Sequence, residues 1–408
     1  MPSDERQSAG IDSANVPFSM SSDSEARAAS ASRTRIASVE AIPVAYPEPN
    51  DHNRTRTVCL VKLTSETGHV GWGEAATHFE EATLPVAKLI DAFAPLVVGQ
   101  DPIQNLSIWR ELKRRSWWYG TGAGFASFAI SAIDTALWDL KGRILDVSVL
   151  DLLGGPAKER LPAIASSHGT LASIEDMAEE IAGWLAGGLN GIKIGFGKLG
   201  DANLGFELDR DIAFVRAVRE AIGPEKKIMI DAGVRNVWDV QAAIRRARAF
   251  EAFGVHWLEE PLGHDDPEGY ATLRAATEIR IAYGEREWNV AGVERLLRTG
   301  TVDVVGLDPG RLEGMTGFAK ACDAIETARR QANAHAWSTA ISTASSTTLS
   351  WYAPVCWQVE VQPNYGPMQT DLVDRPIRHE GGWMPLPTGP GLGIKVQDDV
   401  VEHFRMDR

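Results

Sequence analysis

The chain has 408 residues, of which 44% are hydrophobic and 24% charged, so it is long enough for two domains or for one large barrel with an accessory domain. Its net charge of −14 makes nucleic acids and anionic membranes poor partners. No apolar run is long enough to span a membrane. An anionic small molecule remains a possible ligand where a local cation attracts it.

The N-terminus and the cysteines bear on cellular location. Residues 1–33 are rich in Ser, Ala and Asp, and they lack both the apolar stretch of a secretory signal and the low acid content of a transit peptide. We expect a disordered leader there. The cysteines Cys59, Cys322 and Cys356 are odd in number, far apart and without metal-ligand spacing. Buried thiols in a reducing cytosol, and hence a cytoplasmic protein, are the expectation.

Residues 34–160 combine strand and helix patterns. Residues 35–47 and 57–75 are rich in β-formers, and the second stretch includes a hairpin that turns at Thr67 and the glycine after it. The strongest helical stretch is 125–145, where apolar residues recur at spacings of three and four, as on a buried helical face. An α+β domain is predicted.

Beyond residue 160, short apolar strands alternate with amphipathic helices such as 208–222 and 237–253. The predicted strand ends lie near His168, Lys193, Asp231, Glu259, Glu285, Asp303, His335 and Glu360. Repeated βα units of this kind predict a barrel over residues 161–365. A doubly wound sheet is the alternative, but its Gly-rich phosphate loop is absent from the sequence. Residues 366–408 no longer show the alternation of strand and helix patterns.

Three successive strand ends carry a carboxylate. In a barrel, Asp231, Glu259 and Glu285 would converge on the rim and repel one another. A divalent cation would relieve the repulsion, and an all-oxygen ligand set favours Mg²⁺. Each acid taken singly could simply end a strand in solvent, but three at matched spacing favour a metal site. Glu259 and Glu260 cannot both face the barrel mouth from a regular strand, and the pattern does not choose between them.

A series of short motifs from residue 34 to the C-terminus resembles the enolase superfamily, and most of all its mandelate racemase branch. Each motif is weak alone, but their order and spacing together are specific. The motifs are GWGEA (71–75), IDTALWDLKGR (133–143), LLGG (152–155), KIGF (193–196), MIDA (229–232), WLEEPL (257–262), GE (284–285), NAHAW (333–337) and PGLGI (390–394).

The resemblance implies an α/β fold: a modified TIM barrel, (β/α)₇β, under an α+β capping domain built from the N-terminal region and the C-terminal segment 366–408. It implies that Asp231, Glu259 and Glu285 bind Mg²⁺, with the first glutamate of the pair as the ligand. The shared chemistry is removal of a proton α to a carboxylate, while the metal opposes the charge that develops. The implied partner is a small-molecule carboxylate, and members are usually homo-oligomers.

The resemblance also assigns catalytic positions. Lys193 matches the base, the second lysine of a Lys-x-Lys motif whose first lysine is Gly191 here; a strand-end lysine reaching solvent is the alternative. His335 matches the histidine of a His–Asp dyad and Asp303 its aspartate, with Asp308 as a nearby rival. Glu360 matches the acid that hydrogen-bonds the substrate carboxylate.

Four residues are candidate substrate contacts. His168 and Arg286 lie at predicted strand ends, and each could instead be structural. Arg54 and Arg56 lie in the polar, aromatic stretch 46–56, where the family's capping domain closes over the substrate. These two arginines could pair with a second carboxylate, as in an aldarate.

A lysine facing a His–Asp dyad allows two reactions. If the histidine protonates a β-hydroxyl, water leaves an acid sugar and a 2-keto-3-deoxy acid forms; we favour this dehydration because most of the branch resembles acid-sugar dehydratases. If a proton returns to the same carbon, the enzyme is a racemase or epimerase of an α-hydroxy acid. The stretch VVGLDPGRLEG after the sixth strand lacks the lysine of the cycloisomerase branch. Gly191 and Gly233, which replace family polar residues, leave open an inactive, metal-dependent acid-sugar binding protein.

Overall fold

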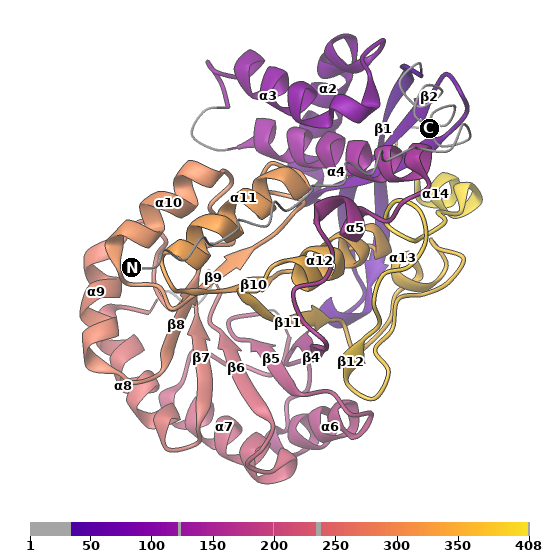
Figure 1. The fold of residues 1–408 in the computed structure, drawn as a ribbon. Coiled ribbons are helices and arrows are strands. Elements are labelled where there is room, and N and C mark those ends of the chain that lie inside the picture. Colours follow the sequence, from indigo (N-terminus) through magenta and orange to yellow (C-terminus); the bar gives the residue numbers. More distant parts are fainter. Residues whose placement is uncertain (1–33, 121–123, 199, 234–237, 407–408) are drawn as a thin grey trace, which may run out of the picture.

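The computed structural model describes residues 34–406, except 121–123, 199 and 234–237. The predicted leader, residues 1–33, lies outside the described residues. Figure 1 shows a smaller part, coloured indigo to magenta, resting on one end of a larger barrel coloured magenta to orange. We call the smaller part the cap.

The cap is a three-stranded antiparallel sheet covered by helices. Its strands follow one another in the order β1-β2-β3, and the tight connection between β2 and β3 confirms the predicted hairpin. The elements are β1 (Ile36–Glu48), η1 (Pro49–Asp51), β2 (Arg54–Ser65), β3 (Val70–His78), α2 (Glu80–Val97), η2 (Pro102–Gln104), α3 (Asn105–Arg115) and α4 (Phe125–Leu145).

Two glycines of the GWGEA motif let α4 lie directly on the backbone of β3. A Cβ atom on Gly71 would come 2.3 Å from the carbonyl oxygen of Ala136, and one on Gly73 would come 1.9 Å from that of Ala132. No side chain larger than hydrogen fits there without separating the two elements. The motif therefore marks a close packing contact within the cap.

The barrel has eight parallel strands and seven intervening helices in the described part of the chain, and β11 pairs with β4 to close it. The fold is thus an α/β, modified TIM barrel, (β/α)₇β, with an α+β capping domain, as predicted. The strands are β4 (Leu161–His168), β5 (Gly191–Gly195), β6 (Lys227–Asp231), β7 (Val255–Glu259), β8 (Arg280–Tyr283), β9 (Val304–Leu307), β10 (Gln331–Ala334) and β11 (Cys356–Val361). The helices are α5 (Val149–Leu153), which precedes the barrel, then α6 (Ile174–Ala186), α7 (Leu208–Ile222), α8 (Val240–Glu251), α9 (Pro267–Ala276), α10 (Val290–Thr299), α11 (Gly314–Thr327) and α12 (Ala340–Tyr352).

Inside the barrel, a layer of apolar side chains lies beneath a layer of polar ones. Met229 and Trp257 belong to a small buried cluster inside the barrel, separate from the main core. Because side chains on a strand alternate between faces, Asp231 and Glu259, each two residues further on, point to the same interior one layer higher. The fold thereby directs these carboxylates toward the end of the barrel that the cap covers.

The C-terminal segment contacts both parts. Its strand β12 (Trp383–Met384) pairs antiparallel with β4 of the barrel, and after α13 (Pro367–Thr370) and α14 (Asp398–Phe404) the chain bridges back to Val44 of β1. None of the described helices combines the length and apolar character needed to cross a lipid bilayer.

Buried acids join cap and barrel. Asp134 of α4 accepts hydrogen bonds from the backbone N–H and the hydroxyl of Thr316 in α11, each 2.8 Å long. Glu74 of β3 accepts one from the hydroxyl of Thr339, which caps α12. Burial is the largest cause that raises the pKa of each carboxyl to about 7. Both groups are therefore protonated in the folded protein at pH values where they ionise in the unfolded chain.

The contribution of Asp134 and Glu74 to stability is expected to fall as pH rises from about 4 to about 7. Between the ordinary pKa of a carboxyl and the raised values of Asp134 and Glu74, the native state binds more protons than the unfolded state, so the unfolding free energy decreases by on the order of 1 kcal/mol per pH unit for each group. Asp134→Asn should flatten this slope, whereas Glu66→Gln at an exposed position should not. Denaturant unfolding at a series of pH values measures both; an unchanged slope in Asp134→Asn contradicts the assignment.

Candidate active site

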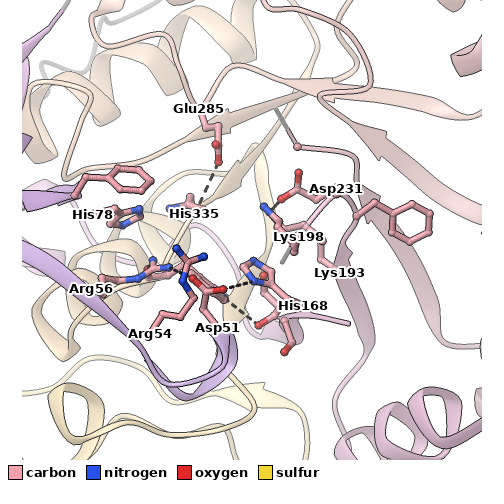
Figure 2. Close-up of a pocket in the computed structure, with 18 of the residues that line it drawn as sticks. Asp51, Arg54, Arg56, His78, His168, Lys193, Lys198, Asp231, Glu285 and His335 are labelled. Atoms are coloured by element: carbon pink, nitrogen blue, oxygen red, sulfur yellow. Dashed lines mark hydrogen bonds and ion pairs between the residues drawn. The ribbon is translucent and has the colours of Figure 1, made fainter. Parts of the chain in front are cut away.

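A cavity of about 300 Å³ lies between the cap and the carboxyl ends of the barrel strands (Figure 2). Its wall is contributed by η1, β2 and β3 of the cap and by residues that end or follow barrel strands. The lining side chains that carry a charge or an imidazole are Asp51, Arg54, Arg56, His78, His168, Lys193, Lys198, Asp231, Glu285, Arg311 and His335.

The three predicted metal ligands come from neighbouring strands. Asp231 and Glu259 are direct register partners on β6 and β7. Glu285 follows β8 after Gly284, whose φ of 130° turns the chain at the rim. Asp231 and Glu285 line the cavity, whereas Glu259 is buried just below it, where the indole N–H of Trp257 donates a 3.1 Å bond to its carboxylate.

The backbone conformation separates the side chains of the adjacent residues Glu259 and Glu260. Glu260 has a φ of 46°, in the left-handed region, which breaks the regular strand alternation. Glu259 contacts Lys193 at 3.0 Å, while Glu260 forms an ion pair with Arg286. The two carboxylates thus have separate partners.

Burial and mutual repulsion set the charges of these acids. Burial raises the pKa of Glu259 well above its usual range, against the opposing effect of Lys193. Burial also raises the pKa of Glu260 to about 8, with Glu285 as the next cause. The pKa of Glu285 is instead well below its usual range, because Arg311 and His335 outweigh burial. The rim therefore carries more carboxyl groups than the nearby cations can keep ionised.

Lys193 lies at the centre of these carboxylates. Its ammonium nitrogen is 2.9 Å from Glu360, 3.0 Å from Glu259 and 3.8 Å from Asp231. Burial alone would lower the pKa of Lys193, but the carboxylates raise it well above its usual value. In this arrangement the lysine is a protonated counter-ion rather than a neutral base.

The donor set fits a hard divalent cation. Among the described residues, no three His, Cys, Asp or Glu side chains are already grouped so as to hold a metal ion. The carboxylates of Asp231, Glu259 and Glu285 nevertheless supply all-oxygen donors on adjacent strands, which is the set that Mg²⁺ prefers. These carboxylates repel one another, and in this structure the Lys193 ammonium reduces the repulsion. A divalent cation bound between them would reduce it as well.

His335 follows β10 and pairs with Asp308, not with Asp303. Its Nδ1 lies 2.8 Å from Asp308, which directly follows β9. Asp303 precedes β9, at the opposite end of the strand, where it binds Arg274 at 2.9 Å and accepts the backbone N–H of Ile281. The predicted Asp303 partner is therefore corrected, because a parallel barrel brings together the carboxyl ends of strands.

Arg311 was not predicted, although it lies in the stretch after the sixth strand that lacks the lysine of the cycloisomerase branch. Its guanidinium lies 3.2 Å from Asp308 and 3.5 Å from Glu285, so it links the dyad to the carboxylates. Although burial opposes this, Arg311 and then His335 hold the pKa of Asp308 below its usual value. The dyad carboxylate consequently stays ionised.

Two predicted contacts do not line the cavity. Glu360 is fully buried beneath it, where it accepts a 2.5 Å bond from the amide of Asn333 and pairs with Lys193. Arg286 is absent from the described lining residues and binds Glu260. Arg286 therefore has Glu260 as its partner in this structure, and its contact with a substrate stays a prediction.

The other predicted contacts and several unpredicted ones form the cap side of the cavity. Arg54 is exposed to the cavity, whereas Arg56 is buried and His168 largely so. The unpredicted lining residues include Asp51, His78, Lys198 and Trp337. Asp51, His78 and Trp337 acquire a role only through contacts between distant segments. Lys198, by contrast, stands close to Lys193 in a Gly-rich stretch, a signal that sequence reasoning could have used.

Two protein-family models together match most of the chain. One, described as Enolase C-terminal domain-like, matches residues 176–400. The other, described as the N-terminal domain of mandelate racemase / muconate lactonizing enzyme, matches residues 42–154. The first covers the larger part of the barrel, and the second covers most of the cap.

Individual relatives differ in their named reactions. D-gluconate dehydratase of Thermoproteus tenax is 31% identical over 367 residues, spanning 89% of this chain and 73% of the relative. D-galactarolactone cycloisomerase of Agrobacterium fabrum is 30% identical over 364 residues, spanning 86% and 92%. The crystal structure of a racemase from Streptomyces coelicolor A3(2) with bound magnesium superimposes with a TM-score of 0.79 at 25% identity, covering 91% of this chain and 100% of that one.

Proposed function

Because the chain belongs to the mandelate racemase/muconate lactonizing enzyme branch of the enolase superfamily, we propose that it is a Mg²⁺-dependent acid-sugar dehydratase. It would remove the proton α to the carboxylate of an aldonate or aldarate and eliminate water to give a 2-keto-3-deoxy acid. The observation that carries the proposal is that three carboxylates on or just after neighbouring strands, a buried lysine and a His–Asp pair lie in or next to the wall of one cavity.

Each group has a distinct task in this chemistry. Asp231, Glu259 and Glu285 would hold the metal, which when bound opposes the negative charge that develops on the substrate carboxylate. Lys193 takes the α-proton once it is neutral; a cation bound by Asp231, Glu259 and Glu285 would offset part of the negative charge that keeps it protonated. His335 protonates the departing β-hydroxyl.

Asp308 supports this proton transfer without contacting the substrate. Its carboxylate faces Nδ1 of His335 at 2.8 Å, which favours the tautomer with a proton on Nδ1. The other nitrogen, Nε2, is then the one that exchanges a proton with the substrate.

Racemisation or epimerisation is the second candidate. Lys193 on β5 and His335 after β10 lie across the barrel from one another, so a proton removed on one side can return from the other. The named relatives include both dehydratase and racemase, which share the first step. Binding without turnover is the third possibility.

A library of aldonates and aldarates, incubated with the protein and Mg²⁺, tests the proposal. The expected result is formation of a 2-keto acid with at least one acid sugar. Proton NMR in D₂O follows exchange of the α-proton in parallel. Exchange or inversion without keto acid would make the protein a racemase or epimerase, and binding without exchange would make it a binding protein.

Metal affinity is expected to distinguish the two adjacent glutamates. Glu259→Gln should weaken Mg²⁺ binding about 10-fold or more, because it removes a charged donor on the strand between the other two ligands. Glu260→Gln should have the smaller effect, since its carboxylate is paired with Arg286. Isothermal titration with Mg²⁺ measures both, and a greater loss in Glu260→Gln would reverse the assignment.

A further inference from the structure

A second His–carboxylate pair stands on the cap side of the cavity (Figure 2). His168 is the last residue of β4, and Asp51 is the last residue of η1 in the cap. Nδ1 of the imidazole lies 3.5 Å from a carboxylate oxygen of Asp51. Barrel and cap therefore each contribute one member of the pair.

Aromatic packing against one face of the His168 imidazole ring also holds it in place. Its ring packs against Trp337, with ring centroids 4.5 Å apart and planes inclined by 30°. The guanidinium of Arg56 lies 4.3 Å from the Trp337 ring centroid and donates a 3.1 Å bond to the backbone carbonyl of Trp337. The indole N–H of Trp337 in turn donates to the carbonyl of Ser166. Such a stack holds His168 in one orientation.

The surroundings favour a neutral imidazole. Nδ1 has no hydrogen-bond partner among the described residues, but the charge of Asp51 at 3.5 Å favours a proton on that atom, which leaves Nε2 as an acceptor. Burial is the largest cause that lowers the pKa of His168 to about 4; Asp51 opposes the shift, and the cations Lys198 and Arg56 add to it. Near neutral pH, His168 thus offers a lone pair rather than a positive charge.

His168 also lies close to the reacting end of the barrel. In the pairing of β4 with β5, Ser166 is the partner of Lys193, and His168 stands two residues further on the same face. It is therefore one layer above the predicted base, toward the cap. A substrate atom next to it is close to the α-carbon or a neighbouring carbon.

Resting on the proposed function, we infer that His168 is a specificity-determining residue that accepts a hydrogen bond from one hydroxyl of the acid-sugar chain. Asp51 is its positioning residue. A hydroxyl suits the Nε2 atom itself better than a second carboxylate, because an ionised carboxylate has no proton to donate to the Nε2 lone pair. Arg54, further along the cap wall, remains the candidate for a second carboxylate.

The test compares substrates that lack single hydroxyls. The acid sugar with the highest kcat/KM in the library, and its monodeoxy analogues, are assayed with the wild type, His168→Leu and His168→Gln. The wild type should prefer the parent over one particular analogue by about 10-fold or more. In His168→Leu this preference should fall below about 3-fold, while the preference over the other analogues is unchanged. His168→Gln, which retains an acceptor, should restore part of it.

Matched controls separate hydrogen bonding from folding. His69→Leu, an exposed histidine on the cap hairpin, should leave every preference unchanged. Asp51→Asn should weaken the same single preference in the wild type but change it less than about 2-fold in His168→Leu, since a positioning residue acts through its partner. Thermal unfolding checks that each variant is folded.

The outcomes distinguish the two proposals. If acid sugars are turned over but His168→Leu keeps every hydroxyl preference, the inference about His168 is wrong and the dehydratase proposal stands. If acid sugars bind without turnover, calorimetric affinities of the same pairs with Mg²⁺ replace kcat/KM, with the same expected pattern. If no acid sugar binds or reacts, both proposals fail.

Discussion

Replacing His335 by Asn is expected to lower kcat of the proposed dehydration about 10²- to 10⁴-fold, the contribution of a positioned general acid. Asn retains much of the size of the side chain but cannot donate a proton to the leaving hydroxyl. The expected KM change is small, because the carboxylates of Asp231, Glu259 and Glu285 all remain in place. Steady-state formation of 2-keto acid measures the effect.

Two aspartates supply the control for this prediction. Asp308→Asn should lower kcat about 10²-fold or more, because it removes the carboxylate 2.8 Å from Nδ1 of His335. Asp303→Asn should stay within about 3-fold of the wild type, since its partner is Arg274 at the other end of β9. Equal losses in the two variants, or a greater loss in Asp303→Asn, would contradict the assignment.

Replacing Lys193 by Met is expected to abolish most activity and also to destabilise the metal-free protein. The variant leaves Glu259 and Glu360 buried without their shared cation, a change that typically costs about 3–5 kcal/mol of unfolding free energy. The cost should be smaller at pH 5 than at pH 8, because burial raises the pKa of Glu259 and its protonation relieves part of the unpaired charge. Denaturant unfolding at both pH values, with kcat measured alongside, tests the two effects.

Added Mg²⁺ should separate a counter-ion role of Lys193 from a purely structural one. If the ammonium balances the carboxylates, then Mg²⁺ should raise the Tm of Lys193→Met by more than it raises that of the wild type. Lys88→Met, which removes an exposed lysine paired with Asp91, should behave like the wild type in both assays. Equal stabilisation of all three proteins by Mg²⁺ would refute the counter-ion role.

Local patterns predicted the elements that build the scaffold. The helix expected over 208–222 is α7, and the one expected over 125–145 is α4, with the same bounds. Both have an apolar stripe of helical period that fixes their type and length. The alternation of strands and helices likewise predicted the barrel, because parallel strands need a crossover segment between them.

The site was less predictable where it depends on strand ends and distant contacts. The strand Val304–Leu307 has an aspartate on each side, and only its direction in the sheet makes Asp308 the residue at the rim. The contact of Asp51 with His168 joins two segments far apart in sequence, and no periodic pattern records it. The ion pair of Arg286 with Glu260 depends on a left-handed residue that propensities do not foresee.

The path of the C-terminal segment constrains how this enzyme can be recombined with its relatives. Arg143 of α4 donates to the carbonyl of Ile394, and Arg405 bridges to β1, while β12 remains paired with the barrel. A chimera that exchanges only the N-terminal region would leave the donor cap without these late contacts. Grafting the specificity of one cap onto another barrel therefore requires the transfer of two separate stretches of gene, one from each end.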